Sequence, residues 1–587
     1  MEIYDAPLKD IRFILEAFGY DEKVASLPAY EDYDLDTVMA LMEESARFCK
    51  EQMLPLNKKG DTQALRYNPE DWSVTTPDGF PSLYSKVREQ GIMGLVHPVE
   101  YGGAGAPNTV GMILSEMGTA TNKSFSMCTG LTHALVDCLV EHGTDAQKKD
   151  YLPRLVSGEW TGTMCLTEPQ CGTDLGLLST RAEPQDDHFL LTGTKIWITF
   201  GEHDMADNII HLVLARLPGA PEGIKGISLF LVPKFTLDGE RNPVYCTGLE
   251  HKMGIRASPT CVISLEGAKG WLVGEPHKGM RAMFIMMNHA RLLVGLEGVA
   301  MGEIAYQTAL AFAHDRRQGR AMDKAKRDPA ASADNILVHP DVRRMLMNIK
   351  ANHEAMRALA YWCGIQMDIA HHHPDDAVRQ NADDLVALLT PIIKSFLTEQ
   401  GFANINEAMQ VCGGAGYTTD WSIELYMRDM RIALIYEGTN HIQALDLVGR
   451  KLPADNGRLF MAFNKEVSDF IRANKDDAGL AEFIEPLKAA SKRLQTVSMA
   501  LGMKGMKDPE EAAAVASPYL NLFALTALAL MWCVQVKAGL ARGDKLGLTK
   551  VKTARYFFKN VLPQSETLVA IIDAGKADMM ALDADEF

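Results

Sequence analysis

A carboxylate at the end of an apolar run is the first feature of this sequence that could do chemistry. Residues 427–443 read MRDMRIALIYEGTNHIQ, so the run Ile432–Tyr436 delivers Glu437 to a Gly-Thr-Asn turn. A carboxylate in such a place loses part of its solvation and becomes a stronger base toward a weakly acidic proton. The same residues also predict a helix start capped by Thr439 or Asn440, in which Glu437 would be structural. Taken alone, the turn favours the structural interpretation.

Two further segments place hydroxyl, amide and aromatic groups around predicted strands. Met164–Asp174 (MCLTEPQCGTD) reads as a strand running into a loop, and such loops can bind an anionic or carbonyl-rich cofactor through backbone N–H groups. Leu191–Gly201 (LTGTKIWITFG) places Trp197 and Thr199 two positions apart, hence on one side of a strand. Taken alone, Trp197 is more typical of a core aromatic residue.

Two glycine-rich segments and a histidine run lack the context of the sites they suggest. Neither Gly102–Gly105 nor Gly413–Gly416 follows a credible strand, which a dinucleotide-binding Rossmann turn requires. Helix ends or a close backbone approach to a ligand explain these glycines better. His371–His373 has no partners at ligand spacing, and the 16 histidines include no His-Glu-x-x-His pattern, so no metal site is expected.

Length, charge and cysteine usage narrow the class of protein. A chain of 587 residues can form several domains, and its net charge of -17 disfavours nucleic acid and anionic membranes as partners. The ten cysteines are scattered and the N-terminus lacks a signal-peptide core, so a soluble cytoplasmic protein is expected. The apolar run Tyr519–Val536 contains Asn521, Thr526 and Gln535, which favours a buried core helix over a membrane span.

The hydrophobic periodicity changes along the chain and predicts an α+β fold that is mainly helical. Short runs spaced by Gly, Pro and Asp predict a β domain inside an otherwise helical chain. The expected domains are a helical domain (1–160), the β domain (161–279), a second helical domain (280–452) and an added helical region (453–587).

Proline, glycine and polar residues mark the expected element boundaries. The segment Asp36–Met53 predicts an amphipathic helix that Pro55 stops. The polar segment Gly319–Asn335 predicts a loop or insertion, and Pro453–Arg458 predicts a hinge.

Several stretches together resemble the acyl-CoA dehydrogenase family of flavoproteins, over about Leu8–Leu452. They occur in the family's order: Glu141–Lys149, Leu166–Pro169, Trp197–Thr199, Gln410–Tyr417, Met427–Asp429 and Tyr436–Thr439. The resemblance implies an N-terminal helical domain, a middle antiparallel β-barrel-like domain and a C-terminal four-helix bundle. The extra C-terminal helices are similar to those of a longer bacterial subgroup.

The resemblance implies an oxidoreductase that uses FAD to form a double bond between the α and β carbons of a short or medium acyl-CoA. Glu437 stands where the family has its catalytic base, which removes the α proton as the β hydrogen leaves as a hydride. Electrons would pass to an electron-transfer flavoprotein, and the enzyme would be a homodimer or homotetramer acting in fatty acid metabolism. An acyl-CoA oxidase using O₂ stays an alternative, as does a general medium- or long-chain dehydrogenase; the charge and Glu437 disfavour a nucleic-acid-binding relative.

The resemblance also assigns binding residues by position. The residues that would contact the flavin ring and its surroundings are Leu166, Thr167, Thr173, Trp197 and Thr199. Contacts to FAD phosphates, some of them on a neighbouring subunit, fall to Arg316, Gln410, Gly413, Gly414 and Thr439. Substrate contacts fall to Thr173, Asn288, Arg291 and Gly438. Read singly, Asn288, Arg291 and Arg316 would each be a solvated helix-face residue.

Three departures from the family pattern bear on these assignments. Gln318–Gly319 replaces a common Thr-Phe, which puts an adenine contact in doubt, and His441 replaces a common Gln. Gln170–Cys171 replaces a pair of small residues in the flavin loop. None of the three replaces the base.

Overall fold

The computed structural model describes residues 2–587, which form two compact units. The helical unit comprises Met1–Ala46, Pro107–Glu116 and Val294–Phe587, and the sheet unit comprises Arg47–Ala106 and Met117–Leu293. The predicted β domain therefore lies in the sheet unit. The turn of Glu437 and the added C-terminal helices lie in the helical unit.

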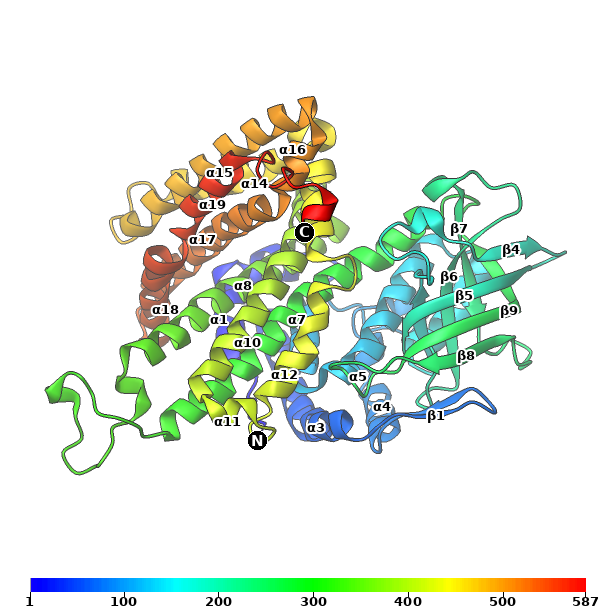
Figure 1. Ribbon diagram of the computed structural model, residues 1–587, viewed down its shortest axis with the longest axis horizontal. Helices are drawn as coiled ribbons and strands as arrows, with labels where there is room; N and C mark the ends of the chain where they lie inside the picture. Colours follow the sequence, from blue (N-terminus) through cyan, green and yellow to red (C-terminus); the bar gives the residue numbers. More distant parts are fainter. Residues whose placement is uncertain (1) are drawn as a thin grey trace. The chain divides into compact units, whose positions relative to one another are not determined.

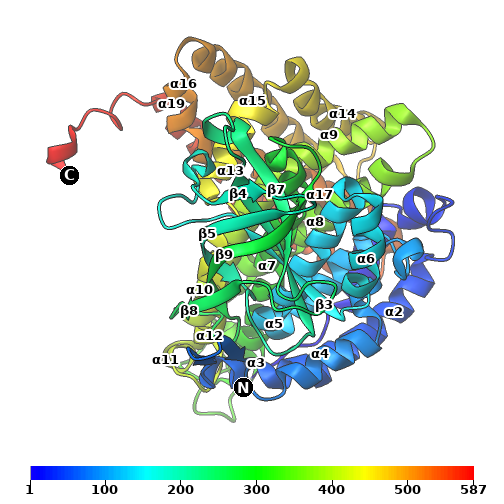
Figure 2. The same ribbon diagram turned by 90° about the vertical axis from the view of Figure 1, so that its right-hand side faces the viewer.

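A seven-stranded sheet forms the centre of the sheet unit. Its order is β3-β6-β4-β5-β9-β7, with β8 paired to β9 beside this path, and an additional β6–β7 pairing closes the strands into a barrel-like ring (Figure 2). Most pairs are antiparallel, as expected, but β3 runs parallel to β6, since the chain between them is long enough to cross over. The strands are β3 (Trp160–Cys165), β4 (Arg181–Pro184), β5 (Phe189–Thr199), β6 (Asn208–Arg216), β7 (Ile227–Pro233), β8 (Val244–Leu249) and β9 (Thr260–Val273).

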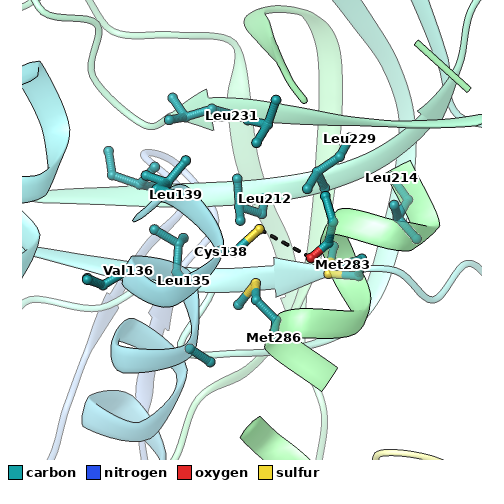
Figure 3. Close-up of a cluster of buried hydrophobic side chains, with 14 of the residues drawn as sticks. Leu135, Val136, Cys138, Leu139, Leu212, Leu214, Leu229, Leu231, Met283 and Met286 are labelled. Atoms are coloured by element: carbon teal, nitrogen blue, oxygen red, sulfur yellow. Dashed lines mark hydrogen bonds between the residues drawn. The ribbon is translucent and has the colours of Figure 1, made fainter. Parts of the chain in front are cut away.

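Helices cover one face of this sheet and bury an apolar core (Figure 3). Residues two apart on β6 and β7 share a face, so their leucines meet side chains of α5 (Asn108–His142) and α7 (Gly279–Asp315). Cys138 of α5 donates to the carbonyl of Ala282 on α7, with an S–O distance of 3.4 Å. The labelled members of this core are Leu135, Val136, Cys138, Leu139, Leu212, Leu214, Leu229, Leu231, Met283 and Met286.

The expected helix stop at Pro55 is wrong. The α2 helix (Leu35–Phe48) continues through a π-helical segment, Cys49–Met53, into α3 (Leu54–Thr62). Pro55 lies in the first turn of α3, where the missing N–H has no helical partner to lose. Two more helices complete this part of the chain, α4 (Phe80–Glu89) and α6 (Asp145–Val156).

The central helices of the helical unit pack closely because glycines face each other. A Cβ on Gly298 of α7 would lie 2.0 Å from the carbonyl oxygen of Leu397, and one on Gly401 would lie 2.5 Å from Gly298 Cα. Only glycine permits this approach at either position. Besides the C-terminal part of α7, these helices are α8 (Pro340–His372), α9 (Asp376–Ile392), α10 (Thr398–Cys412), α12 (Ile423–Met430) and α13 (Asn440–Asp446).

The added C-terminal helices share the core of the helical unit. In α17 the indole nitrogen of Trp532 donates to the carbonyl of Ala351 on α8 at 3.0 Å. Within residues 2–587, α17 is the one helix long and apolar enough to cross a membrane, but 89% of its most apolar window is buried. It is therefore a core helix of the helical unit, and it lies against α8 (Figure 1). The added helices are α14 (Arg458–Ala473), α15 (Ala481–Lys507), α16 (Pro509–Ala514), α17 (Ala516–Arg542), α18 (Lys545–Tyr556) and α19 (Gln564–Ala574).

A buried charge network joins the two ends of the chain inside the helical unit. The Arg357 guanidinium contacts Asp10, Glu116 and Glu303, with N–O distances of 2.6, 2.8 and 2.6 Å. Lys550 of α18 contacts Asp10 and lies 2.8 Å from Glu354. Since these groups are removed from water, each charge depends on its partners.

Candidate active site

Glu437 occupies a strained turn between a 3₁₀ segment, Arg431–Leu434, and α13. Its side chain is half-buried, and its φ of 58° is left-handed, as is the φ of 84° at Gly438. For glutamate such a conformation costs about 1–3 kcal/mol and persists only where surrounding contacts impose it. Strain of this kind is typical of functional residues.

Two buried side chains hold the turn from its C-terminal side. Gln443 Nε2 donates to the carbonyls of Glu437 and Gly438 at 3.1 and 3.2 Å. Lys394 Nζ donates to the Gly438 carbonyl at 2.7 Å and to Asn440 Oδ1 at 3.0 Å. Both donors are fully buried, so their contacts order the backbone that carries the carboxylate.

Thr439 caps the helix that follows, as one of the two sequence interpretations predicted. Its hydroxyl accepts from the N–H of Ile442 at 3.4 Å, and the residue is the N-cap of α13. The helix has seven residues. The predicted cap is therefore confirmed for Thr439, and the role of Glu437 as a base stays a prediction.

The predicted flavin loop is fixed by a buried ion pair in the sheet unit. Lys195 Nζ lies 2.8 Å from Glu168 Oε1, and the two side chains are 0% and 1% exposed. The carboxylate also accepts from Gln170 Nε2 at 2.6 Å and from the backbone and hydroxyls of Ser179 and Thr180. Burial alone would raise the pKa of Glu168, but the charge and hydrogen bonds of Lys195 and the bonds of Thr180 and Ser179 lower it to about 2.

The same pair shapes the backbone of the loop. Lys195 Nζ donates to the Leu166 carbonyl at 3.0 Å, and the N–H of Ile196 donates to the Thr167 carbonyl at 2.9 Å. Leu166 and Thr167 are half-buried, whereas Thr173 is exposed at the far end of the loop. The loop thus keeps one shape while offering an open hydroxyl.

Trp197 is exposed, so its interpretation as a core aromatic residue is wrong. The pairing of β5 with β9 shifts register between Lys195 and Ile198, and this bulge turns Trp197 outward. Its side chain is 59% exposed with a φ of 60°, while Thr199 is half-buried. A rigidly held, open indole face can stack on a planar ring.

The residues assigned to FAD phosphates lie on open surface in the helical unit. Arg316 is exposed with its guanidinium 5.6 Å from the Phe312 ring centroid, and Gln410 is exposed near the end of α10. Gly413 has φ 57° and ψ -141°, a conformation that suits glycine. A Cβ built on Gly414 would meet nothing within 4 Å, so a phosphate can approach its backbone.

The two substrate-binding candidates on α7 differ in exposure. Asn288 is exposed, in line with a solvated helix face. Arg291 is only 6% exposed, with its guanidinium 6.0 Å from the Phe284 ring centroid, so the solvated interpretation is wrong for this residue. A buried arginine has lost much of its hydration, so its charge depends on the groups around it.

The predicted residues divide between the two units. The helical unit holds Glu437, Gly438, Thr439, Arg316, Gln410, Gly413 and Gly414, and the sheet unit holds Leu166, Thr167, Thr173, Trp197, Thr199, Asn288 and Arg291. Within residues 2–587 no group of three or more His, Cys, Asp or Glu is placed to hold a metal ion.

Sequence reasoning missed four residues that support these candidates. Lys394 and Gln443 hold the base turn, Lys195 holds the flavin loop, and Glu297 contacts Tyr436 beside the base. One signal was present for the lysines: each is a single cation inside an apolar stretch, LLTPIIKSFL and TKIWI. A cation in such a place must find a buried partner.

Comparison with known proteins identifies the family. The models for the N-terminal, middle and C-terminal domains of acyl-CoA dehydrogenase match residues 36–159, 163–268 and 277–452. A model described as acetyl-CoA dehydrogenase C-terminal like matches residues 463–583. The chain therefore belongs to the acyl-CoA dehydrogenase family, whose members are FAD-dependent oxidoreductases.

Individual relatives cover nearly the whole chain. The 3-methylmercaptopropionyl-CoA dehydrogenase of Ruegeria pomeroyi is 41% identical over 574 residues, which are 95% of this chain and 96% of that protein. The broad-specificity linear acyl-CoA dehydrogenase FadE5 of Mycobacterium tuberculosis is 32% identical and covered fully, as is this chain. The structure of an acyl-CoA dehydrogenase from Bacillus anthracis complexed with FAD has a TM-score of 0.76 at 23% identity, covering 94% of this chain and 90% of that one. That likeness shows the shared fold.

The described residues fit the FAD of this family. An open indole at Trp197 and a rigid loop ending at Thr173 suit a planar, carbonyl-bearing ring. The glycines at Gly413 and Gly414 leave room for a phosphate to reach the backbone.

Proposed function

We propose that this protein oxidises the Cα–Cβ bond of a short or medium acyl-CoA, with Glu437 as the base. The observation that carries the proposal is the turn at Glu437, where buried donors hold the backbone that carries the carboxylate at a strained φ of 58°. The membership of the family supports the same assignment.

The chemistry asks two things of the protein. The α C–H of a thioester is too weakly acidic for a freely solvated carboxylate, so the base must be shielded and aimed. Glu437 is half-buried and the backbone of its turn is held. General base catalysis of this kind raises the reaction rate roughly 10²- to 10⁴-fold.

Bound FAD would accept the β hydrogen as a hydride. Leu166, Thr167, Thr173, Trp197 and Thr199 would orient its ring, which limits the geometries in which transfer can occur.

For the acyl group we propose 3-(methylthio)propanoyl-CoA, with 3-(methylthio)acryloyl-CoA as the product. The support is the 41% identity to the 3-methylmercaptopropionyl-CoA dehydrogenase across 95% of this chain. The enzyme would then act in the breakdown of dimethylsulfoniopropionate. The 32% identity to a broad-specificity linear acyl-CoA dehydrogenase favours a second candidate, a general fatty acyl-CoA dehydrogenase.

The electron acceptor and the assembly are part of the proposal. Electrons would pass to an electron-transfer flavoprotein in the cytoplasm, and a homodimer or homotetramer would bring the exposed Arg316, Gln410 and Gly413 to a neighbouring subunit's FAD. An oxidase would instead form hydrogen peroxide during turnover. Assays with an artificial acceptor under air and under argon separate the two.

The test is bleaching of the FAD-loaded enzyme by acyl-CoAs of graded length, with the methylthio compound included. We expect the methylthio substrate to give the highest kcat/KM, and Glu437→Gln to lower the bleaching rate roughly 10²- to 10⁴-fold. Glu399→Gln, an exposed change on α10, is the matched control and should keep the parental rate. A parental rate in Glu437→Gln with intact FAD content would show that Glu437 is not the base.

A further inference from the structure

A buried carboxylate on α7 contacts the residue that precedes the base. Glu297 is 9% exposed, and the hydroxyl of Tyr436 lies 2.6 Å from both of its carboxylate oxygens. The hydroxyl has one proton and donates it to the carboxylate at short range. A hydrogen bond to an ionised group is about twice as strong as a neutral one.

This contact restrains the residue before Glu437 in the chain, whereas Gln443 and Lys394 restrain Glu437 itself and the residue after it. Those two side chains donate to the carbonyls of Glu437 and Gly438, whereas Glu297 accepts from the side chain of the preceding residue, Tyr436. Tyrosine has only two side-chain torsions, so fixing its hydroxyl also restrains the backbone of Tyr436. The left-handed φ at Glu437 is therefore enclosed between restrained neighbours.

We propose that Glu297 is a positioning residue, which acts through Tyr436 to aim the carboxylate of Glu437. The proposal rests on the function proposed above, in which Glu437 is the base. A buried carboxylate costs solvation, and a leucine would fill a similar volume on α7. Glu297 supplies what an apolar residue could not, a fixed acceptor for the Tyr436 hydroxyl.

A second tyrosine–glutamate pair in the same unit gives a matched comparison. Tyr361 of α8 donates to Glu116 at 2.6 Å, and Glu116 is also held by Arg357 in the buried charge network. The two pairs have the same donor, the same acceptor and the same distance. Only the Tyr436 pair adjoins the base in sequence.

The experiment compares Glu297→Leu, Tyr436→Phe, their double variant and the control Tyr361→Phe, all loaded with FAD. We expect each of the first two changes to lower kcat roughly tenfold to a hundredfold, since misplacing a reacting group by about 1 Å has that effect. KM for the acyl-CoA should change by less than about threefold, because the base touches only the α proton. The double variant should be no slower than the slower single variant, since both changes break one interaction.

The control separates positioning from stability. Tyr361→Phe should lower the melting temperature as Tyr436→Phe does, yet keep kcat within about twofold of the parent. The proposal is overturned if Tyr436→Phe keeps the parental kcat, if the effects of the two changes multiply, or if Tyr361→Phe lowers kcat equally. Should Glu297→Leu fail to fold, Tyr436→Phe and its control decide.

Failure of this inference differs from failure of the function itself. If the parent oxidises acyl-CoA and Glu437→Gln does not, parental kcat in the Glu297 and Tyr436 variants overturns the positioning role alone. If Glu437→Gln is as active as the parent, the assignment of the base fails first.

Discussion

The base turn in the helical unit (Glu437–Asn440) and the flavin loop in the sheet unit (Met164–Asp174) are both ordered by a buried lysine, but the two lysines bind different kinds of partner. The base turn contains Glu437 with a left-handed φ of 58°, and Trp197 on β5, beside the flavin loop in the assigned site, has a left-handed φ of 60°. Both lysines are fully buried. Lys195 pairs with the carboxylate of Glu168 at 2.8 Å. Lys394 donates instead to a carbonyl and to an amide oxygen, of Gly438 and Asn440.

The difference follows from what each segment must carry. The flavin loop can bury its ion pair, because Glu168 is a structural group and need not react. In the proposed function Glu437 accepts a proton, and a lysine paired directly with its carboxylate would favour the ionised form and weaken it as a base. Lys394 orders the turn through its contacts with the Gly438 carbonyl and the Asn440 amide oxygen.

The largest expected effect is that of Lys195→Met in the flavin loop. The change leaves Glu168 buried without its cation, which should cost about 3–5 kcal/mol of unfolding free energy. Urea unfolding measures the loss, and FAD content should fall with it. Adding Glu168→Leu should restore part of the stability. If Lys195→Met unfolds at the same urea concentration as the parent, the ion pair does not stabilise the flavin loop.

Acid should act on the same pair. The pKa of Glu168 is about 2 in the folded protein and 4.5 ordinarily, so its stabilising contribution is complete above pH 4.5 and is lost as pH falls toward 2. A shift of this size corresponds to about 3 kcal/mol. Urea midpoints between pH 6 and 3 check this, with Glu168→Gln expected to show a shallower decline.

Lys394→Met should separate stability from activity in the base turn. Losing the donor to the Gly438 carbonyl should cost about 1–3 kcal/mol, less than breaking the ion pair in the other unit. Because the turn carries the base, kcat should fall further than the stability loss explains. Equal destabilisation in Lys394→Met and Lys195→Met would contradict the distinction between the two lysines.

The smallest expected effects on stability are those of changes at Gly413 and Gly414, the two glycines that follow α10. Gly413→Ala should destabilise by about 1–3 kcal/mol, because φ 57° with ψ -141° suits glycine alone. Gly414→Ala should stay within about 0.5 kcal/mol, since its Cβ would enter open space. Thermal unfolding gives the stability of each variant. If the Gly414 change weakens FAD binding at unchanged stability, a close approach to the backbone is supported.

Some expectations came correctly from local chemistry and others did not. The cap at Thr439 and the main strands depend on residues within a few positions, so periodicity and side-chain type suffice. Pro55 was misread because a proline in a first turn and a proline after a last turn look alike in sequence. Trp197 was misread because a bulge breaks the alternation that places residues on a face.

The sequence by itself determined that an apolar run ends in Glu437, that a capped helix follows, and that strands interrupt a helical chain. The tertiary structure alone decided which buried groups meet. Lys394 is 44 residues from Gly438, and Glu297 is 139 residues from Tyr436. Contacts at such separations depend on how whole helices pack, because a buried polar group must find its partner wherever the fold places one.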